Sequence, residues 1–404
     1  MMLDRLKSLD LILLASVLGL LSIGLLAIYS TSQSGGDTNY FASQLKWIFL
    51  GVGIMVVAAF LPNRLYYEIS YPLYGLSLIL LVVVLFWGTA GYGATRWIRL
   101  GGFGFQPSEF AKITTVLALA RFLSDERWEI NRPKNFAVAS LIIALPFLLI
   151  AKQPDLGTGL VFIVLALPIF YWVGLNTVSL VLIVAPAVVF IAAFNLYAFA
   201  VVIVLILAFL YYTRMPLLRS AGYMVFTVSL WFIRSFFWNQ LKDYQKQRIT
   251  TFWNPEADPL GSGYQIIQSK VAIGSGGLLG KGFLQGSQTQ LRFLPEQHTD
   301  FIFAVIGEEF GFLGVLLTLA IFTVLLVRIV HASNMYRSEF SSVIGIGIAT
   351  IIGFHMFVNV GMTIGLAPVT GLPLPFISYG GSALLSNLLM IGFLLNFYRH
   401  RYEY

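Results

Sequence analysis

Long apolar runs are the feature that most constrains this chain. The stretch 11–29, LILLASVLGLLSIGLLAIY, holds no charged residue over the roughly 17–25 residues that a helix needs to cross a bilayer. Similar runs recur along the whole sequence, so that 58% of its 404 residues are hydrophobic and 11% are charged. Because a soluble core cannot absorb so much apolar sequence, the chain is predicted to be an integral membrane protein.

The apolar runs predict an all-α polytopic membrane protein with twelve spans in a single domain, 1–404. The closely spaced runs between 174 and 238 leave two, three or four spans open there. One long polar loop, 239–300, interrupts the pattern. The expected spans are 10–30, 44–61, 70–88, 107–123, 136–151, 158–172, 177–195, 197–212, 221–238, 301–328, 340–363 and 378–397.

The charge pattern predicts how the spans are oriented. Arg5 and Lys7 precede the first run, and no small-residue cleavage motif follows it, so we expect an uncleaved first helix with a cytoplasmic N-terminus. Twelve spans then place both termini in the cytoplasm and loop 239–300 outside. The formal charge of +7 fits the Lys and Arg excess of cytoplasmic loops, rather than nucleic-acid binding. Arg96 and Lys152 fall outside against that rule, which suggests that they serve to bind an anion.

Cysteine and histidine usage narrows the chemistry. The chain has no cysteine, which excludes disulfides, thiolate metal sites and a cysteine nucleophile. Its four histidines are scattered through the sequence, which argues against a histidine-rich metal centre.

Asp300 is the strongest single candidate for chemistry. The long loop ends in His298-Thr299-Asp300, where the next apolar helix begins, and the loop also carries Lys270, Lys281 and Arg292. An aspartate at a helix start is commonly only a cap. A carboxylate under a cationic loop at the mouth of a membrane helix is, however, suited to catalysis.

The two glutamates that follow Asp300 are not expected to pair with it. At about 100° per residue, Glu308 lies roughly 80° from the face of Asp300, and Glu309 lies on the opposite side. The spacing therefore predicts one acting carboxylate, and not the carboxylate pair of a glycosidase.

Two charged groups lie closer to the N-terminus. Glu109 and Lys112 share one helix face and can pair; ionisable groups inside a bilayer are functional by default, although a structural ion pair is the alternative. Arg96 and Arg99 flank Trp97, and their guanidinium forks suit phosphate, although an interfacial tryptophan between solvated arginines explains them equally well.

Three further motifs have simpler interpretations. Asp155 can cap the helix that follows it. The stretch 274–282, GSGGLLGKG, only weakly matches a P-loop, because no Ser or Thr follows Lys281, and flexible glycines explain it better. The last outside loop is rich in Pro, Gly and Ser, and is expected to line the same site as Asp300.

Several long motifs together resemble the SEDS family (shape, elongation, division and sporulation) of bacterial envelope proteins. The likeness covers nearly the whole chain, and the wording IQSKVAIGSGG favours the elongation branch over the division branch. The family pattern has ten spans, so the interval 174–238 is expected to hold an extra helical hairpin. The motifs are RWIRLGGFGFQPSEFAK, KQPDLGTG, DYQKQRI, NPEADPLGSGYQIIQSKVAIGSGGLLGKG, LPEQHTDFIFAVIGEE and GLPLPFISYGGS.

The resemblance implies a peptidoglycan glycosyltransferase that polymerises lipid II at the outer face of the bacterial cytoplasmic membrane. The essential loop aspartate of the family corresponds to Asp300, which would act as general base. Glu109 and Lys112 match the glutamate and lysine of its fourth helix. We expect Arg96, Lys112, Lys270 and Arg248 to stabilise the diphosphate leaving group, with His298 as a further substrate-binding residue.

The same resemblance implies the partners. These are a class B penicillin-binding protein, the lipid II substrate, membrane proteins of the elongation complex and membrane lipid, with no nucleic acid. No cofactor is required by the residues, although Glu109 could help to bind a divalent cation such as Mg. Two other functions stay open: a lipid II flippase with the same charged cavity, and a non-catalytic scaffold for a penicillin-binding protein.

Overall fold

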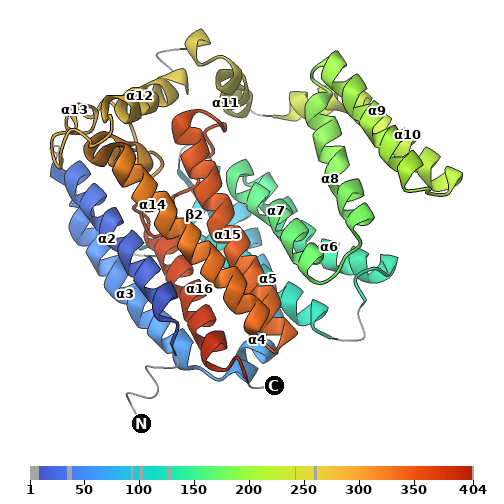
Figure 1. The fold of residues 1–404 in the computed structure, drawn as a ribbon, viewed down its shortest axis with the longest axis horizontal. Coiled ribbons are helices and arrows are strands. Elements are labelled where there is room, and N and C mark those ends of the chain that lie inside the picture. Colours follow the sequence, from blue (N-terminus) through green and yellow to red (C-terminus); the bar gives the residue numbers. More distant parts are fainter. Residues whose placement is uncertain are drawn as a thin grey trace.

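The computed structural model describes residues 9–33, 39–91, 94–100, 103–125, 129–241, 243–258 and 262–402. Twelve long helices among them occupy the stretches predicted to span a membrane, and most run side by side (Figure 1). They are α2 (Leu11–Gln33), α3 (Tyr40–Phe60), α4 (Asn63–Trp87), α5 (Pro107–Leu123), α6 (Pro133–Lys152), α7 (Leu156–Trp172), α8 (Thr177–Ala192), α9 (Leu196–Tyr212), α10 (Leu217–Gln240), α14 (Ile302–Met335), α15 (Glu339–Ile364) and α16 (Gly381–Arg399).

The helices confirm a polytopic membrane fold. Within the described ranges, seven helices are long and apolar enough to cross a bilayer, namely α2, α3, α4, α6, α14, α15 and α16, while α7, α8 and α9 are shorter apolar helices. Helix α5 has 17 residues and carries three charged side chains, and α10 carries two arginines. The total of twelve spans therefore stays a prediction.

Local sequence signals set the ends of several helices. Asp155 accepts hydrogen bonds from the backbone N–H of Thr158 (3.2 Å) and from its hydroxyl (2.9 Å), which confirms its predicted role as the cap of α7. Prolines occupy the first turns of α5 and α6, where no backbone donor is lost. Gly365 ends α15 with a φ of 76°, a left-handed conformation that favours glycine.

Helix α15 lies at the centre of the bundle. It packs against α5, α7, α14, α16 and the short helix α12 (Ser262–Ser275), while α16 packs against α3 and α14 packs against α2. The first residues of α2 and the last residues of α16 lie at one end of the bundle, and the segment that follows α10 covers the other end (Figure 1). The long polar loop therefore lies at the opposite end of the bundle from the start of α2 and the end of α16, while the side of the membrane on which the termini lie stays a prediction.

The predicted loop 239–300 is largely folded. It forms α11 (Asp243–Trp253), the 3₁₀ helix η1 (Pro255–Ala257), α12 (Ser262–Ser275) and α13 (Ser287–Gln290). The glycines of 274–282, expected to be flexible, include two that permit close packing: a Cβ on Gly276 would lie 2.0 Å from Gly307 O, and one on Gly280 would lie 2.0 Å from Glu309 O. The backbone therefore packs directly against α14, which is broken at Gly311 (φ 62°, ψ −161°).

A small antiparallel sheet was not expected from the sequence. Strands β1 (Thr89–Gly91), β2 (Ala94–Leu100) and β3 (Phe103–Phe105) pair in that order between α4 and α5, where a glycine-rich loop was predicted. The Ser382 hydroxyl joins this sheet to the start of α16, because it donates to Gly104 O (3.1 Å) and accepts from Gln106 N (3.3 Å). Strand β2 carries Arg96.

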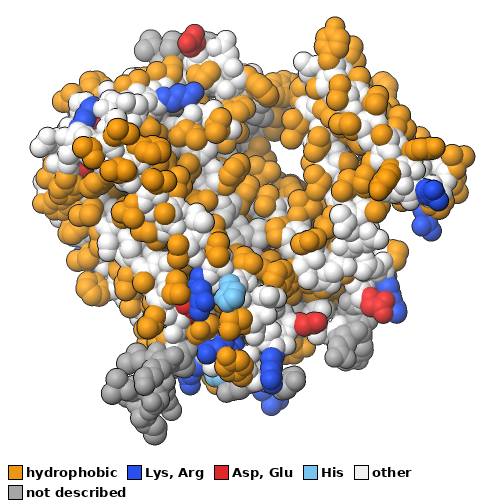
Figure 2. Space-filling view, in the orientation of Figure 1, with side chains coloured by type: hydrophobic (Ala, Val, Ile, Leu, Met, Phe, Trp, Pro, Cys, Tyr) orange, Lys and Arg blue, Asp and Glu red, His pale blue; other side chains and the backbone are white. Residues whose placement is uncertain are grey.

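Helices α8, α9 and α10 stand apart from the other helices (Figure 1) and form what we call the α8–α10 module. The module has its own small core of Ala185, Val189, Ile206 and Leu210. An apolar groove of about 790 Å³ lies between α7, α8 and α9, and Figure 2 shows the hollow that separates the module from the bundle. The expected extra hairpin falls in this region, and its number of spans stays a prediction.

Candidate active site

Asp300 lies in the turn that precedes α14, and the backbone of this turn is held at three consecutive carbonyls. Tyr379 N donates to His298 O (2.9 Å), and the Ser378 hydroxyl donates to Thr299 O (2.6 Å). The Asn359 side-chain amide donates to Asp300 O (3.0 Å). The Asp300 backbone is therefore fixed by residues from α15 and from the loop that follows it.

The loop 371–379 is the predicted proline- and glycine-rich loop, and it packs against the Asp300 turn as expected. Asn359 also donates to Leu372 O (2.8 Å), so one buried amide joins the loop to Asp300. Ser378 accepts a hydrogen bond from Leu374 N (2.8 Å), which closes the loop on itself. Gly371 has a φ of 74°, and a Cβ there would lie 3.4 Å from Asp300 Oδ2.

The surroundings of Asp300 suit a base that works near neutral pH. Burial raises the pKa of its carboxyl to about 6, and the nearby charge of Glu296 adds to this rise, while the cations Arg248 and Arg96 oppose it. Arg248 belongs to α11 and Arg96 to β2, so two elements bring positive charge to one carboxylate. A carboxylate with this pKa can accept a proton at pH 7 and remains mostly ionised beforehand.

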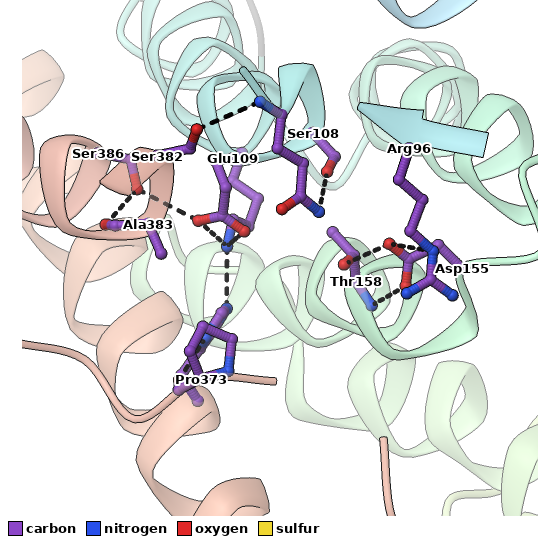
Figure 3. Close-up of polar contacts among 12 residues, drawn as sticks. Arg96, Ser108, Glu109, Asp155, Thr158, Pro373, Ser382, Ala383 and Ser386 are labelled. Atoms are coloured by element: carbon purple, nitrogen blue, oxygen red, sulfur yellow. Dashed lines mark hydrogen bonds and ion pairs between the residues drawn. The ribbon is translucent and has the colours of Figure 1, made fainter. Parts of the chain in front are cut away.

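Arg96 is fixed by the turn between α6 and α7. Its Nη2 donates to Pro154 O (3.1 Å). Its Nε lies 3.4 Å from Asp155 Oδ2, a contact that Figure 3 shows. The predicted cap of α7 thus also orients the arginine. The side chain of Arg99, the other arginine of this motif, lies outside the described part of the chain.

Glu109 and Lys112 form the predicted ion pair and are almost completely buried, at 3% and 2% exposed. Lys112 Nζ lies 3.0 Å from both carboxylate oxygens of Glu109, and the Ser386 hydroxyl donates to Glu109 Oε2 at 3.2 Å (Figure 3). A third contact joins Lys112 Nζ to His355 Nε2 at 3.0 Å. The pair therefore belongs to a network that joins α5, α15 and α16.

Sequence reasoning missed His355 as a site residue. Its Nδ1 lies 3.3 Å from Pro373 O, within the loop 371–379. A histidine in the middle of an apolar helix is a signal in itself, because ionisable groups in membrane helices are costly. Asn359, one turn further along, gives the same signal.

The remaining predicted residues are distributed around this end of the bundle. His298 stacks on Tyr40 with ring centroids 4.0 Å apart, and burial lowers the pKa of its imidazole. Lys270, on α12, is exposed and lies over Gly365, where a Cβ would be 2.6 Å from Nζ. A cation at that place also complements the C-terminal end of α15.

Glu308 and Glu309 serve other parts of the structure. Glu308 accepts hydrogen bonds from Lys281 Nζ (2.8 Å) and from the backbone N–H groups of Gln288 (2.8 Å) and Thr289 (3.0 Å). Glu309 accepts a hydrogen bond from Ser30. Each glutamate thus has its own partners, as expected for residues that do not pair with Asp300, and the single acting carboxylate stays a prediction.

The residues around Glu109 do not fit a divalent cation. Lys112 already contacts both of its oxygens. Among the described residues, no group of three or more Asp, Glu and His side chains is placed to hold a metal ion.

The buried Glu109–Lys112 network lies beneath the partly buried Asp300 carboxylate, and both belong to a bundle of apolar helices. These features define a polytopic membrane protein with an ionic site at one end. The chain belongs to the cell cycle protein family of FtsW, RodA and SpoVE, whose model matches residues 7–200 and 195–403. This family comprises the SEDS proteins, so the resemblance seen in the motifs is confirmed.

Named relatives match nearly the full length of the chain. It is 39% identical over 393 residues to the peptidoglycan glycosyltransferase MrdB of Escherichia coli K12, covering 97% of this chain and 94% of the relative. It is 33% identical over 438 residues to the peptidoglycan glycosyltransferase RodA of Treponema pallidum, covering 96% of each. Relatives named FtsW match as well.

Solved structures agree with the fold. One, described as the structural coordination of polymerization and crosslinking by a peptidoglycan synthase complex, aligns with a TM-score of 0.75 at 31% identity, covering 98% of this chain and 99% of the other. The rod shape determining protein RodA of Thermus thermophilus aligns with a TM-score of 0.66 at 27% identity, covering 98% of each.

Proposed function

We propose that this chain is a peptidoglycan glycosyltransferase that polymerises lipid II into glycan strands during cell elongation and shape control. The names of its full-length relatives support this activity. The observation that carries the proposal is Asp300, a carboxyl with a pKa raised to about 6 that lies near two cations. We place this site at the extracytoplasmic face of the bacterial inner membrane, with both termini in the cytoplasm.

Asp300 acts as general base in a single displacement. Its carboxylate takes the proton from the 4-hydroxyl of the acceptor sugar as that oxygen attacks C1 of the donor. The bond from C1 to the diphosphate oxygen breaks, and undecaprenyl diphosphate leaves with the electron pair. This single displacement inverts C1 of the donor, so the α-linkage to the diphosphate is replaced by a β-1,4 glycosidic bond, and no second catalytic carboxylate is needed. A nucleotide sugar is not needed either, because the diphosphate already activates the donor.

Fixed cations stabilise the negative charge that develops on the leaving group. Arg96 and Arg248 are the first choices, because both act on the charge state of Asp300. Lys112 is engaged by Glu109 and His355, so it supports the site from below in this state. Lys270 lies at the end of α15, where an arriving anion can reach its exposed side chain.

A class B penicillin-binding protein is the proposed partner, because a matching structure is described as a complex that couples polymerization to crosslinking. We expect further contacts with membrane proteins of the elongation complex and with membrane lipid. The polymerase supplies the glycan strands, and the partner supplies the transpeptidase that crosslinks them.

Polymerisation by the purified complex tests the proposal against the flippase and the scaffold. We expect Asp300→Asn to lower the initial rate by about 10²–10⁴-fold, the usual contribution of a general base, while folding and partner binding persist. Intact polymerisation by this variant would remove Asp300 as the base. Absence of polymer from both wild type and variant, in a folded complex, would favour a flippase or a scaffold.

A further inference from the structure

Two polar side chains on α15, His355 and Asn359, have no role in the mechanism above, yet they connect its parts. They lie one helical turn apart and therefore on the same face of α15. His355 is 4% exposed and Asn359 is 0% exposed, within a helix that is otherwise largely apolar on its buried side. Burying polar groups in this way is costly unless each is used in specific contacts.

The contacts of His355 define the position of its proton. Lys112 has hydrogen-bond donors and no acceptor, so its Nζ must donate to Nε2 of His355 at 3.0 Å. The imidazole proton then resides on Nδ1, which donates to Pro373 O at 3.3 Å. A directed chain of hydrogen bonds thus runs from the loop 371–379 through His355 and Lys112 to Glu109.

Asn359 extends this chain to the reacting group. Its amide donates to Leu372 O (2.8 Å), beside the carbonyl that His355 holds, and to Asp300 O (3.0 Å). Two adjacent carbonyls of the loop are therefore held by two adjacent turns of α15. A shift of α15 against α5 would move the loop and the Asp300 backbone together.

We propose that His355 and Asn359 are positioning residues, which couple the buried Glu109–Lys112 pair to the placement of Asp300 through the carbonyls of Pro373 and Leu372. Neither residue contacts the reacting atoms in this account. This inference rests on the proposed function, because it assigns the coupling to the same catalytic carboxylate.

Two substitutions at each residue distinguish a positioning role, which depends on hydrogen bonds, from a role that depends only on the size of the side chain. His355→Phe keeps a ring but removes both hydrogen bonds, whereas His355→Gln retains one acceptor and one donor, as a neutral imidazole does. Asn359→Asp keeps the shape but faces two carbonyls with an acceptor in place of a donor, and Asn359→Ala removes the contact. Thr350→Val is the matched control on α15. It also removes one side-chain hydrogen bond, because the Thr350 hydroxyl donates to Ile346 O (2.8 Å), but that bond stays within the helix.

The experiment measures lipid II polymerisation by the purified complex with its penicillin-binding partner, over lipid II concentration and pH. We expect His355→Phe, Asn359→Ala and Asn359→Asp to lower kcat at least tenfold with KM changed less than twofold. His355→Gln should recover kcat to within about threefold of wild type, and Thr350→Val should match wild type.

The pH profile of kcat is a second measurement, and it would not change if His355 and Asn359 had a purely structural role. The charged groups that act on Asp300 are Glu296 of its own turn, Arg248 of α11 and Arg96 of β2, and every variant keeps them. A loosened Asp300 becomes more hydrated, which lowers its pKa towards the ordinary value. In Asn359→Ala the acid limb of kcat should therefore move to lower pH by at least half a unit.

Failure of the inference differs from failure of the proposed function. If Asp300→Asn is inactive while the His355 and Asn359 variants retain wild-type kcat and acid limb, the coupling is wrong and the function stands. Loss of kcat that only follows a loss of folded protein, with the acid limb unmoved, would also overturn the coupling. Full polymerisation by Asp300→Asn would instead remove the proposed catalytic role itself.

Discussion

The core around α15 and the α8–α10 module are both built from apolar helices, but they are held together differently. Between α5, α15 and α16, the buried contacts include an ionic and hydrogen-bonded network through Glu109, Lys112, His355 and Ser386, in addition to apolar packing. The module packs a few small and aliphatic side chains, with a hydrogen bond from the Tyr223 hydroxyl to Leu182 O (2.8 Å) and no ion pair among its described residues, and many of its large apolar residues are exposed.

This difference indicates which helices of the chain must adopt one fixed arrangement. In a bilayer, lipid tails are as apolar as leucine, so apolar contacts between helices do little to favour one helix neighbour over another. Polar contacts between helices fix both partner and register. In the bundle, one such network, through Glu109, Lys112 and His355, is joined to the loop that holds the Asp300 turn. We expect the module, which faces the hollow in Figure 2, to shift without disturbing that carboxylate.

Breaking the buried ion pair should have the largest effect on thermal stability and on polymerisation. Lys112→Met leaves the Glu109 carboxylate buried without its cation, and removing one partner of such a pair typically costs about 3–5 kcal/mol. We expect a large fall in thermal stability in detergent and loss of polymerisation. Glu109→Gln combined with Lys112→Met should recover part of the stability, because no charge is then left unpaired.

The exposed pair of Arg64 and Glu68 provides the control. Its side chains are 88% and 55% exposed, and such pairs typically contribute about 0–1 kcal/mol. Arg64→Gln should leave thermal stability and polymerisation close to wild type. Equal losses for Lys112→Met and Arg64→Gln would contradict the assignment of the buried network as the organising contact.

Neighbouring charges should shift the pH profile of the rate by smaller amounts and in opposite directions, separately from the loss of rate expected when Arg96 no longer stabilises the leaving group. Arg96 lowers the pKa of Asp300 and Glu296 raises it. Arg96→Gln should therefore move the acid limb of the rate to higher pH, since the base stays protonated longer as pH rises. Glu296→Gln should move the limb to lower pH. Profiles of initial rate between pH 5 and 8 measure both, and shifts of the same sign would refute this electrostatic account.

Substitutions inside the module should have the smallest effect on activity. Val189 is fully buried in the core of the module, and Val189→Ala should speed hydrogen exchange in α8 and α9. Polymerisation should stay within about twofold of wild type, and exchange in α15 should not change. A loss of activity comparable to that of Lys112→Met would show that the module is coupled to the site after all.

The sequence predicts well whatever depends on local pattern. Apolar runs locate the helices, and an aspartate followed by a helix predicts the cap at Asp155. The i,i+3 spacing of Glu109 and Lys112 predicts their contact, because helix geometry alone brings them together. The position of Asp300 before an apolar helix is also evident from local order.

What the sequence did not reveal depends on contacts between distant segments. His355 meets Lys112 across 243 residues, and no local periodicity encodes that meeting. The glycines near Gly276 were expected to be flexible, yet that glycine is needed for close approach to Gly307, which requires knowing that α14 lies there. The three-stranded sheet likewise forms in a segment whose glycines favour a loop interpretation.

The pH dependence of residual activity tests the role of Asp300 most directly. Lipid II polymerisation would be measured from pH 5 to 8 for wild type and Asp300→Asn in complex with the penicillin-binding partner. We predict that the wild-type rate falls about tenfold per pH unit below a pKa of about 6, and that the small residual rate of Asp300→Asn lacks this acid limb. The same acid limb in both proteins would contradict Asp300 as the general base.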